Sequence, residues 1–451
     1  MEKVDVVLLY EHVARELDVL CAVKWLLVNQ YGLRVEIIHQ PYGVPSALQK
    51  FWPSVVAVPF CYFNFQRDYP CLFDWFPATF VNLAWEELFY SGNQKAKLPR
   101  GRFETQHILH QAWGEFFADL LQQQGVPRRN IFLNGHPAYK LFDPPYRAYF
   151  ATRNELASRY GLDTHKRWIF FPENYNWAFY QNWRLDEFQQ AGGLERAHLD
   201  AMVRFTRESF TQVMRWCHAL ALSNDVELII RPRPLTPLDD FRAAMLQVVS
   251  DLPPAIHITK AESVREWILA SEVVVSSYST SLIEAGVAGK PAFMAEPCPL
   301  PEVLMVDWQQ SVPRLRTLAE FEAACRSAAT STHHNQVGLW ARTTMLSRGD
   351  PIANLARFLA DVHLGRVARP PRPGYGSLTF KKERAWLPDW IWFQQQRRAG
   401  YEQRRAQPQD ISPFYEMDRF QPHEIEARVQ RWGQFLGSDT MPDHGAARGL
   451  Q

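Results

Sequence analysis

Short runs of apolar, largely β-branched residues alternate with segments of helical periodicity, and this alternation restricts the fold more than any other feature of the chain. Within the first sixty residues, strands are predicted at 4–10, 33–38 and 55–59, and a helix at 15–29. Strands that are apolar on both faces and separated by helices are typical of parallel sheets covered on both sides. The sequence therefore predicts an α/β protein.

The alternation continues in two series. The first adds a strand at 79–83, a helix around 107–123 and a strand at 130–134. The second series follows a helix at 151–160. Strands are predicted at 168–172 and 226–231, and helices at 199–222 and 239–250. Further β and α units follow at 256–258, 264–269, 273–276, 281–288 and 291–295.

Two such series predict two Rossmann-like, doubly wound lobes that face one another across a ligand-binding cleft. A length of 451 residues agrees, since domains usually hold roughly 100–200 residues. We place the N-terminal lobe at 1–145 and the C-terminal lobe at 146–365. A Pro-rich linker and a basic, aromatic C-terminal segment occupy 366–451.

The composition excludes several classes of protein. Lys and Arg total 49 against 48 Asp and Glu, so we expect no nucleic-acid partner. The six cysteines are scattered without a Cys-x-x-Cys pair, which indicates reduced thiols and no metal site. The first residues lack the basic region of a secretory signal, and no apolar run approaches the ~18 residues of a membrane span. We expect a cytoplasmic protein, with peripheral contact at the inner membrane as an open alternative.

A hydroxyl-rich loop after the strand predicted at 273–276 is the most informative segment. Hydroxyls and backbone N–H groups at the start of a helix bind phosphate. Glu284, one turn into that helix, is suited to accept hydrogen bonds from a ribose diol. Alternatively, Ser279 or Thr280 only caps the helix. The phosphate ligands predicted from this loop are Ser276, Ser277, Ser279, Thr280 and Ser281.

Two arginines follow from the strand predicted at 226–231. Arg231 and Arg233 each precede a proline, which stiffens the turn, and guanidinium groups pair bidentately with phosphate. Because the carboxyl ends of parallel strands meet at one edge of a sheet, we expect both arginines beside the hydroxyl loop. The alternative is that they pair with Asp239 and Asp240.

These segments resemble a known family. Ser-Thr-Ser-Leu-Ile-Glu-Ala-Gly-Val-Ala-Gly-Lys-Pro at 279–291, with Arg-Pro-Arg-Pro at 231–234, is similar to the nucleotide-binding half of GT-B glycosyltransferases of bacterial surface polysaccharide synthesis. CDP-glycerol glycerophosphotransferases and the UDP-N-acetylglucosamine 2-epimerase group share the general pattern. Segments 11–18, 82–87 and 113–114 also fit the surface-carbohydrate branch, as does 134–141, although His136 and Ala138 depart from the usual Gly-Asn-Pro-Arg. The resemblance spans about residues 4–300.

The resemblance implies a GT-B fold and a metal-independent transferase without a cofactor. A nucleotide-sugar donor, whose sugar is 3-deoxy-manno-octulosonic acid (Kdo) in part of that branch, would bind the C-terminal lobe. The acceptor would be a surface polysaccharide or lipid-linked glycan, as in capsule or O-antigen synthesis, on the N-terminal lobe. Glycerol phosphate transfer, epimerisation and an inactive nucleotide- or glycan-binding scaffold remain as alternatives.

Sugar transfer requires a carboxylate that accepts a proton or attacks the sugar. The candidates follow apolar runs and are Glu16, Glu86, Glu87 and Glu173. His136 follows a strand and precedes a proline, so it either faces the cleft or hydrogen-bonds the backbone of the turn. The aromatic stretch at 175–183 forms either a sugar-stacking wall or interdomain core.

The C-terminal segment at 386–405 combines aromatic and basic side chains. It is interpreted as a helix packed across the lobes or as an amphipathic surface that contacts anionic lipid.

Overall fold

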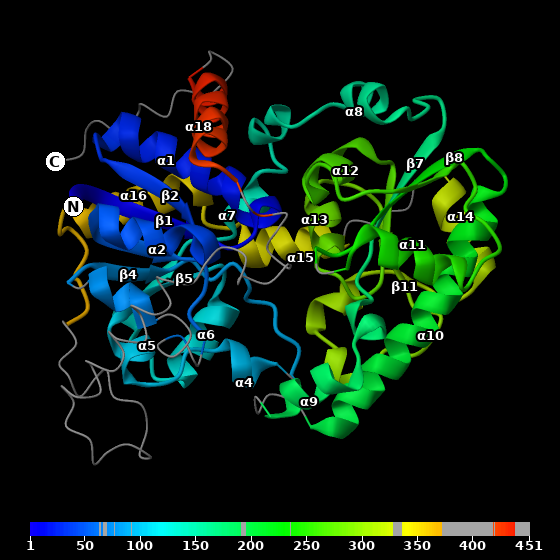
Figure 1. Cartoon of the computed structure of the whole chain (residues 1–451), viewed down its shortest axis with the longest axis horizontal. Helices are drawn as coiled ribbons and strands as arrows, with labels where there is room; N and C mark the ends of the chain where they lie inside the picture. The colour runs from blue at the N-terminus through cyan, green and yellow to red at the C-terminus, as the bar shows by residue number, and fades with distance from the viewer. Residues whose placement is uncertain are drawn as a thin grey trace. The chain divides into compact units, whose positions relative to one another are not determined.

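The computed structural model describes residues 1–62, 65, 70–75, 77–91, 93–190, 195–234, 236–327, 336–371, 418 and 420–437. Figure 1 shows the chain as a ribbon. Two compact units are present, each built around a six-stranded sheet. Unit 1 comprises Met1–Glu87, Ala96–Leu141 and Met345–Gln451, and unit 2 comprises Leu88–Lys95 and Phe142–Thr344.

The sheet of unit 1 is parallel throughout and has the strand order β2-β1-β3-β4-β5-β6. The interior strand β1 buries its apolar side chains on both faces, as its largely apolar sequence predicted. The strands are β1 (Glu2–Tyr10), β2 (Val35–His39), β3 (Phe51–Val58), β4 (Thr79–Asn82), β5 (Ile108–Ala112) and β6 (Ile131–Leu133).

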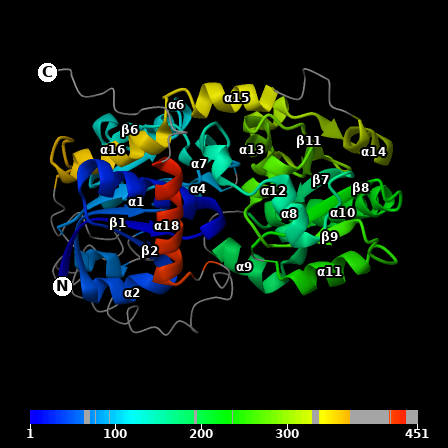
Figure 2. The ribbon, with the colours of Figure 1, turned by 90° about the horizontal axis from the view of Figure 1, so that it is seen from above.

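Helices cover both faces of this sheet. α1 and α16 contact each other on one side of β1, and α2 lies on the opposite side (Figure 2). α18 packs against α1. The helical segments are η1 (Val13–Leu17), α1 (Asp18–Tyr31), α2 (Gln40–Lys50), η2 (Pro70–Trp75), α5 (Arg102–Gln106), α6 (Glu115–Gln123), η3 (Arg128–Asn130), α7 (Pro137–Lys140), α16 (Pro351–His363) and α18 (Pro422–Leu436), while α4 (Gln94–Lys97) spans a boundary between the units.

The sheet of unit 2 is also parallel, in the order β12-β11-β10-β7-β8-β9. Alternate residues of β7 serve different faces. Ile169 and Phe171 join the core formed with α10, α11 and α14, whereas the Trp168 ring lies 6.4 Å from the Trp267 ring of α12. The strands are β7 (Arg167–Pro172), β8 (Val226–Arg231), β9 (Ile256–Ile258), β10 (Val273–Ser276), β11 (Ala292–Ala295) and β12 (Arg314–Leu315).

The helical segments of unit 2 follow the predicted alternation. They are η4 (Tyr146–Tyr149), α8 (Arg153–Tyr160), η5 (Asn176–Phe179), α9 (Asn182–Gln190), α10 (Arg196–Ala221), α11 (Leu238–Leu246), α12 (Val264–Ala270), α13 (Ser281–Val287), η6 (Glu302–Leu304), η7 (Asp307–Ser311), α14 (Leu318–Arg326) and α15 (Gln336–Met345).

In each sheet the strand that comes first in the chain lies inside the sheet. β1 lies between β2 and β3, and β7 lies between β8 and β10. The winding therefore reverses beside β1 and beside β7. Doubly wound sheets bind ligands at the carboxyl ends of the strands where this reversal occurs. We therefore expect ligands to bind at the loops after β1 and β3 in unit 1 and after β7 and β10 in unit 2.

The helix predicted at 107–123 is wrong over its first part, which is strand β5, and only α6 follows as a helix. Two polar residues concealed this strand. His110 bonds through Nε2 to the carbonyl of Glu104 at 2.8 Å, and Gln111 Nε2 donates to the carbonyl of Leu83 at 2.7 Å. These buried hydrogen bonds let polar side chains occupy an interior strand.

The unit boundaries also differ from the predicted domain boundaries. Residues 88–95 belong to unit 2, and the chain returns to unit 1 at Met345 instead of ending its second lobe at 365. The described part of 366–451 belongs to unit 1, because α18 packs on α1. The basic and aromatic stretch predicted at 386–405 lies outside the described residues.

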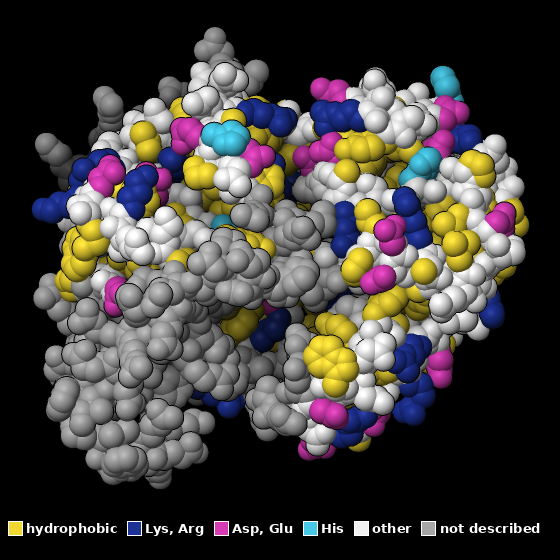
Figure 3. All heavy atoms as spheres, in the orientation of Figure 1, with side chains coloured by type: hydrophobic (Ala, Val, Ile, Leu, Met, Phe, Trp, Pro, Cys, Tyr) yellow, Lys and Arg dark blue, Asp and Glu magenta, His cyan; other side chains and the backbone are white. Residues whose placement is uncertain are grey.

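The surface carries no gathering of one charge on the coloured face drawn in Figure 3, where acidic and basic side chains are interspersed on each unit. This agrees with a formal net charge of +1. In the part of the chain that the structure describes, none of the helices combines the length and apolar character needed to cross a bilayer.

Candidate functional site

The winding reversal of unit 2 brings the ends of β7 and β10 together. Ser276, the last residue of β10, donates its hydroxyl to the carbonyl of Pro172, the last residue of β7. Because β8 is the other neighbour of β7, the turn that carries the two arginines starts at the same edge. The two segments predicted from sequence to hold phosphate therefore begin on the strands that flank β7.

Glu173 links β7 to β8. Its backbone N–H donates to the carbonyl of Arg231 at 2.9 Å, and its carboxylate accepts the backbone N–H groups of Arg233, at 3.1 Å, and Tyr175. Burial raises the pKa of Glu173, and the two N–H donors and the Arg233 side chain oppose this rise. Only 3% of Glu173 is exposed. Because its oxygens accept these two N–H groups, the carboxylate holds the loop backbone in place.

The two predicted arginines point to different partners. Arg231 is buried, and its Nη2 donates to the carbonyls of Lys260 at 3.3 Å and Glu262 at 3.1 Å. Arg233 Nη1 donates to the side-chain oxygens of Asn174, at 2.6 Å, and Asn176, at 3.0 Å. Arg233 thus lies over the loop that follows β7, whereas Arg231 reaches the connection between β9 and α12.

The hydroxyl loop divides into a buried part and a partly exposed part. Within the described residues, the Ser277 hydroxyl is buried and has no hydrogen-bond partner. Ser279 Oγ lies 3.2 Å from Ser281 Oγ and accepts the backbone N–H of Ser281 at 3.3 Å. Thr280 occupies the N-cap position of α13, but its side chain makes no capping hydrogen bond. Glu284 lies half-buried in the first turn of α13.

The aromatic stretch after Glu173 is mostly core. Tyr175 is buried and joins the core beneath α10, and Phe179 packs against the same core. Trp177 belongs to a second cluster with residues of α10. Trp183, in contrast, is largely exposed. Most of this stretch therefore belongs to the core of unit 2, and not to the interdomain core that was one of its two predicted roles.

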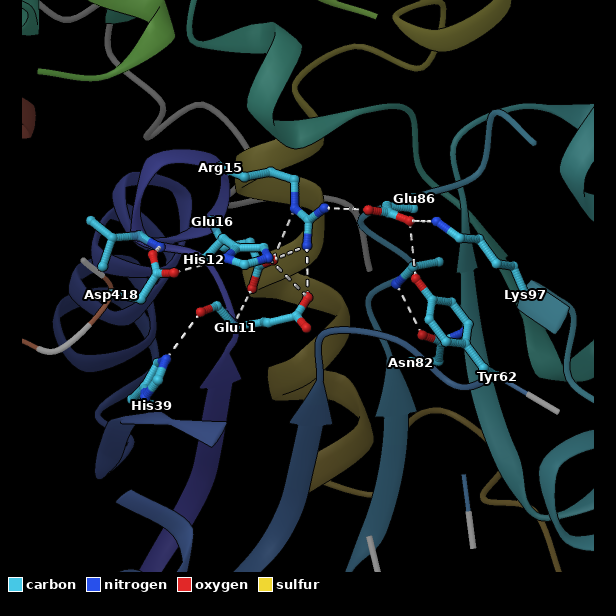
Figure 4. A network of polar contacts seen from close by, with 12 residues as sticks. Glu11, His12, Arg15, Glu16, His39, Tyr62, Asn82, Glu86, Lys97 and Asp418 are labelled. Carbon is cyan, nitrogen blue, oxygen red and sulfur yellow. Dashed lines mark hydrogen bonds and ion pairs between the residues drawn. The ribbon is translucent and has the colours of Figure 1, made fainter. Parts of the chain in front are cut away.

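A network of charged side chains occupies the carboxyl edge of unit 1 (Figure 4). At its centre, Arg15 bonds three carboxylates. Its Nε and Nη2 donate to Glu16 Oε1 at 2.9 and 2.6 Å, its Nη2 to Glu11 Oε2 at 3.2 Å, and its Nη1 to Glu86 Oε1 at 2.7 Å. Lys97 and the Tyr62 hydroxyl, the latter at 3.1 Å, donate to the other oxygen of Glu86.

The network gives Glu16 and Glu86 different character. Burial raises the pKa of Glu16, although Arg15 opposes the rise, and Glu16 Oε2 accepts the backbone N–H of Glu11 at 2.7 Å. Burial would also raise the pKa of Glu86, but Lys97 and Arg15 outweigh it and hold that pKa well below its usual range. Glu86 therefore stays ionised and, with 35% of its side chain exposed, lies at the edge of the network.

Glu87 points away from this network although it follows Glu86 directly. Both of its carboxylate oxygens accept the backbone N–H of Trp113, at 3.0 and 2.8 Å, and only 1% of the residue is exposed. Burial raises the pKa of Glu87 well above its usual value. Its contacts fix the turn between β5 and α6.

His136 makes the backbone contact that was one of its two predicted roles. Its Nδ1 accepts the N–H groups of Ala138 at 3.1 Å and Tyr139 at 3.3 Å, so it caps α7. Its ring centroid lies 3.6 Å from that of Tyr139 and 3.7 Å from that of Trp113. The residue is buried.

A pair that the sequence did not predict lies beside the network. His12, two residues after β1, donates Nδ1–H to Asp418 Oδ2 at 2.8 Å, and Asp418 Oδ1 accepts the backbone N–H of Val13 at 2.7 Å. The position of His12 directly after the first strand was an available signal. Asp418 had none, because it lies 406 positions further along the chain.

Within the described ranges, no three His, Cys, Asp or Glu side chains are grouped as ligands for a metal ion.

The fold is similar to that of several solved structures. Two structures of the wall teichoic acid polymerase TagF match at TM-scores of 0.51 and 0.52 with 10% sequence identity, covering 81% of this chain and 90% and 89% of theirs. UDP-GlcNAc 2-epimerase from Neisseria meningitidis, bound to UDP-GlcNAc, matches at a TM-score of 0.49 and 12% identity, covering 81% of this chain and all of that one.

The TagF matches, together with the two parallel six-stranded sheets, show that the chain has a GT-B fold built from two Rossmann-like units. No protein-family model and no curated protein matches the sequence.

Proposed function

We propose that this chain is a metal-independent glycosyltransferase that moves a sugar, such as Kdo, from a nucleotide-sugar to a surface polysaccharide or lipid-linked glycan. One observation carries the proposal. At the winding reversal of unit 2, the hydroxyl loop after β10 is joined to the loop after β7, where Arg233 is held by Asn174 and Asn176. This edge is where doubly wound sheets bind nucleotides.

In this proposal, Arg233 and the loop hydroxyls bind the phosphates of the donor. A guanidinium group and fixed hydroxyl donors stabilise the charge that builds up on a departing phosphate, and this requires no metal ion. Glu284 would accept hydrogen bonds from the ribose. The candidate phosphate ligands are Arg233, Ser277, Ser279, Thr280 and Ser281, whereas Arg231 and Ser276 hold the neighbouring loops through backbone carbonyls.

The transfer itself forms a bond between an acceptor oxygen and the anomeric carbon. The bond from that carbon to the donor phosphate breaks, and the phosphate leaves with the electron pair. The acceptor hydroxyl loses its proton to a base. Glu16, Glu87 and Glu173 use their oxygens to hold backbone groups and Glu86 is bound by two cations, so we assign the role of base to none of these four.

Transfer of a polyol phosphate from a CDP-linked donor is the second candidate. The specific support is the structural likeness to TagF, one of whose structures was obtained after soaking with CDPG. The same phosphate ligands would serve, but the bond that breaks would lie between the two phosphates of the donor.

Calorimetric titration with CMP, UDP, GDP and CDP tests the site, and CMP-, UDP-, GDP- and CDP-linked donors test turnover. We expect one nucleotide to bind, and Arg233→Ala to weaken it by about 10- to 100-fold, which corresponds to the loss of one charge-assisted hydrogen bond. Arg242→Ala is the matched control, since Arg242 lies exposed on α11.

Each outcome discriminates between the candidates. Unchanged nucleotide affinity in a folded Arg233→Ala protein would refute the assigned site. Binding without turnover of any donor would favour the inactive scaffold, and release of glycerol phosphate from a CDP-linked donor would favour the second candidate.

A further inference from the structure

Lys260 is a buried lysine at the carboxyl edge of the unit 2 sheet. It lies two residues after β9, and the N–H of Thr259 donates to the carbonyl of Ile230 on β8 at 3.0 Å, which keeps the two strand ends together. Only 8% of Lys260 is exposed, and its Nζ donates to the carbonyl of Pro234 at 2.9 Å. Pro234 is the last residue of the arginine turn at 231–234. Lys260 therefore connects the segment between β9 and α12 to that turn.

Arg231 makes the reciprocal contact. Its Nη2 donates to the carbonyls of Lys260 and Glu262, so each of the two segments gives a cationic side chain to backbone oxygens of the other. Glu262 is fixed in turn by α8, since Arg159 Nη1 and the Tyr160 hydroxyl donate to its Oε1 at 2.6 and 2.9 Å. The arginine turn is therefore attached to a segment that is itself held in place.

The backbone of the arginine turn is held on both sides of Arg233. Glu173 Oε2 accepts the N–H of Arg233 at 3.1 Å, and the carbonyl of Arg233 accepts the N–H of Thr236 at 3.0 Å. Lys260 holds the next carbonyl, that of Pro234. Loss of the Lys260 contact should therefore loosen the backbone that carries the Arg233 guanidinium.

Positive charge exceeds negative charge at this edge. In the part of the chain that the structure describes, Lys260 bonds to a carbonyl and Arg233 to two amide oxygens, and neither forms a salt bridge with a carboxylate. Burial lowers the pKa of Lys260, the charge of Arg231 acts in the same direction, and Glu173 opposes both. Burial of an ammonium group costs free energy unless an anion compensates its charge. The surplus of positive charge favours an anionic ligand.

We propose that Lys260 is a positioning residue of the donor site, which locks the arginine turn and favours a diphosphate over a monophosphate through its charge. This inference rests on the proposed function, in which Arg233 binds the phosphates of the donor. Lys260 acts through the turn that it holds and through its electrostatic field. Because each added phosphate brings more negative charge, this field stabilises a bound nucleoside diphosphate more than the monophosphate.

Calorimetric titration of the full-length chain tests the effect of charge. Wild type, Lys260→Met and Lys166→Met are compared with CMP and CDP, UMP and UDP, and GMP and GDP. Lys260→Met keeps an apolar stem and removes the charge and the donor. We expect it to weaken the diphosphate that binds by about 10-fold and the matching monophosphate by about 3-fold.

Lys166→Met is the matched control. It removes the same charge from the opposite edge of the same sheet, where Lys166 directly precedes β7 and its Nζ donates to Asn224 Oδ1 at 2.7 Å. We expect it to leave both affinities unchanged. Lys260→Arg, which keeps a charge and a donor, should partly restore the preference for the diphosphate.

Hydrogen exchange without ligand supplies the second readout. The N–H groups of Arg233 and Thr236 report on the turn, because they donate to Glu173 and to the Arg233 carbonyl. Lys260→Met should speed their exchange by about 10-fold, while exchange in β10 and throughout Lys166→Met stays as in wild type.

Two results would overturn the inference. Unchanged exchange at Arg233 and Thr236 in Lys260→Met would show that Lys260 does not hold the turn. Affinity losses that are absent, or equal for monophosphate and diphosphate, would show that its charge does not act on the phosphates. Absence of nucleotide binding by wild type would instead refute the proposed function and with it the diphosphate preference, whereas the exchange rates would still decide whether Lys260 holds the turn.

Discussion

Replacement of Gly433 by Ala should loosen the attachment of α18 to α1. A Cβ atom at this position would lie 2.5 Å from Trp25 Nε1 and 2.6 Å from Trp25 Cδ1, both far inside normal contact distance. The indole ring of Trp25 or the helix must then move. Because α18 holds the chain that carries Asp418, the displacement should also reach the His12 pair.

The expected cost follows from two opposing terms. Insertion of a methyl group into a packed contact costs about 1–3 kcal/mol. Replacement of a helical Gly by Ala returns up to about 1 kcal/mol through backbone entropy. We therefore expect Gly433→Ala to lower the free energy of unfolding by about 1–2 kcal/mol, with faster hydrogen exchange in α18.

Gly437→Ala is the matched control at the end of the same helix. Its φ of −89° suits any residue, and a Cβ there would lie 3.9 Å from Trp25 Cζ2, although 3.0 Å from the Gly433 carbonyl oxygen. We expect a change within about 0.5 kcal/mol. Urea unfolding and hydrogen exchange compare the two variants. Equal stability and equal α18 protection in both would refute the steric argument and the packing of α18 that it assumes.

Two further predictions concern stability. Burial raises the pKa of Glu87, so the folded protein is more stable with this carboxyl protonated than with it ionised. This stabilisation is complete below about pH 4.3 and is lost as the pH rises through the folded-state pKa. Glu87→Gln keeps an amide oxygen that accepts the Trp113 N–H but cannot ionise. It should therefore remove this part of the decline in the free energy of unfolding between about pH 4 and 8, as measured by urea unfolding. An identical pH dependence in wild type and variant would contradict this reasoning. A Cβ on Gly286 would lie 2.6 Å from Val337 Cγ1 and 2.7 Å from the backbone nitrogen of Gly338, so Gly286→Ala should cost about 1–3 kcal/mol in urea unfolding. An unchanged midpoint would show that α15 does not pack against α13 there.

Much of the fold was predictable because strands buried on both faces leave a simple pattern. β1, β7, β8 and β10 are largely apolar, and their positions match the predicted strands closely. The pattern failed at β5, where His110 and Gln111 are buried. Their hydrogen bonds go to residues that are distant in sequence or outside the segment, so the run itself gives no sign that its polar groups are satisfied.

The candidate site was predictable only in part, for a similar reason. The hydroxyl loop and the arginine turn follow strands, so their place at one edge of unit 2 was implied by the parallel sheet. The direction of each side chain was not implied. Arg231 and Arg233 are separated by one residue and bond to different loops, and Glu86 and Glu87 are adjacent but differ in burial and charge state.

By itself, the sequence determined the alternation of strands and helices, and with it a pair of doubly wound sheets, because side-chain burial on a strand or helix is a local, periodic property. Only the tertiary structure decided which polar groups meet. Asp418 reaches His12 across 406 positions because α18 docks on α1, and no local pattern encodes a contact that depends on where a distant helix packs.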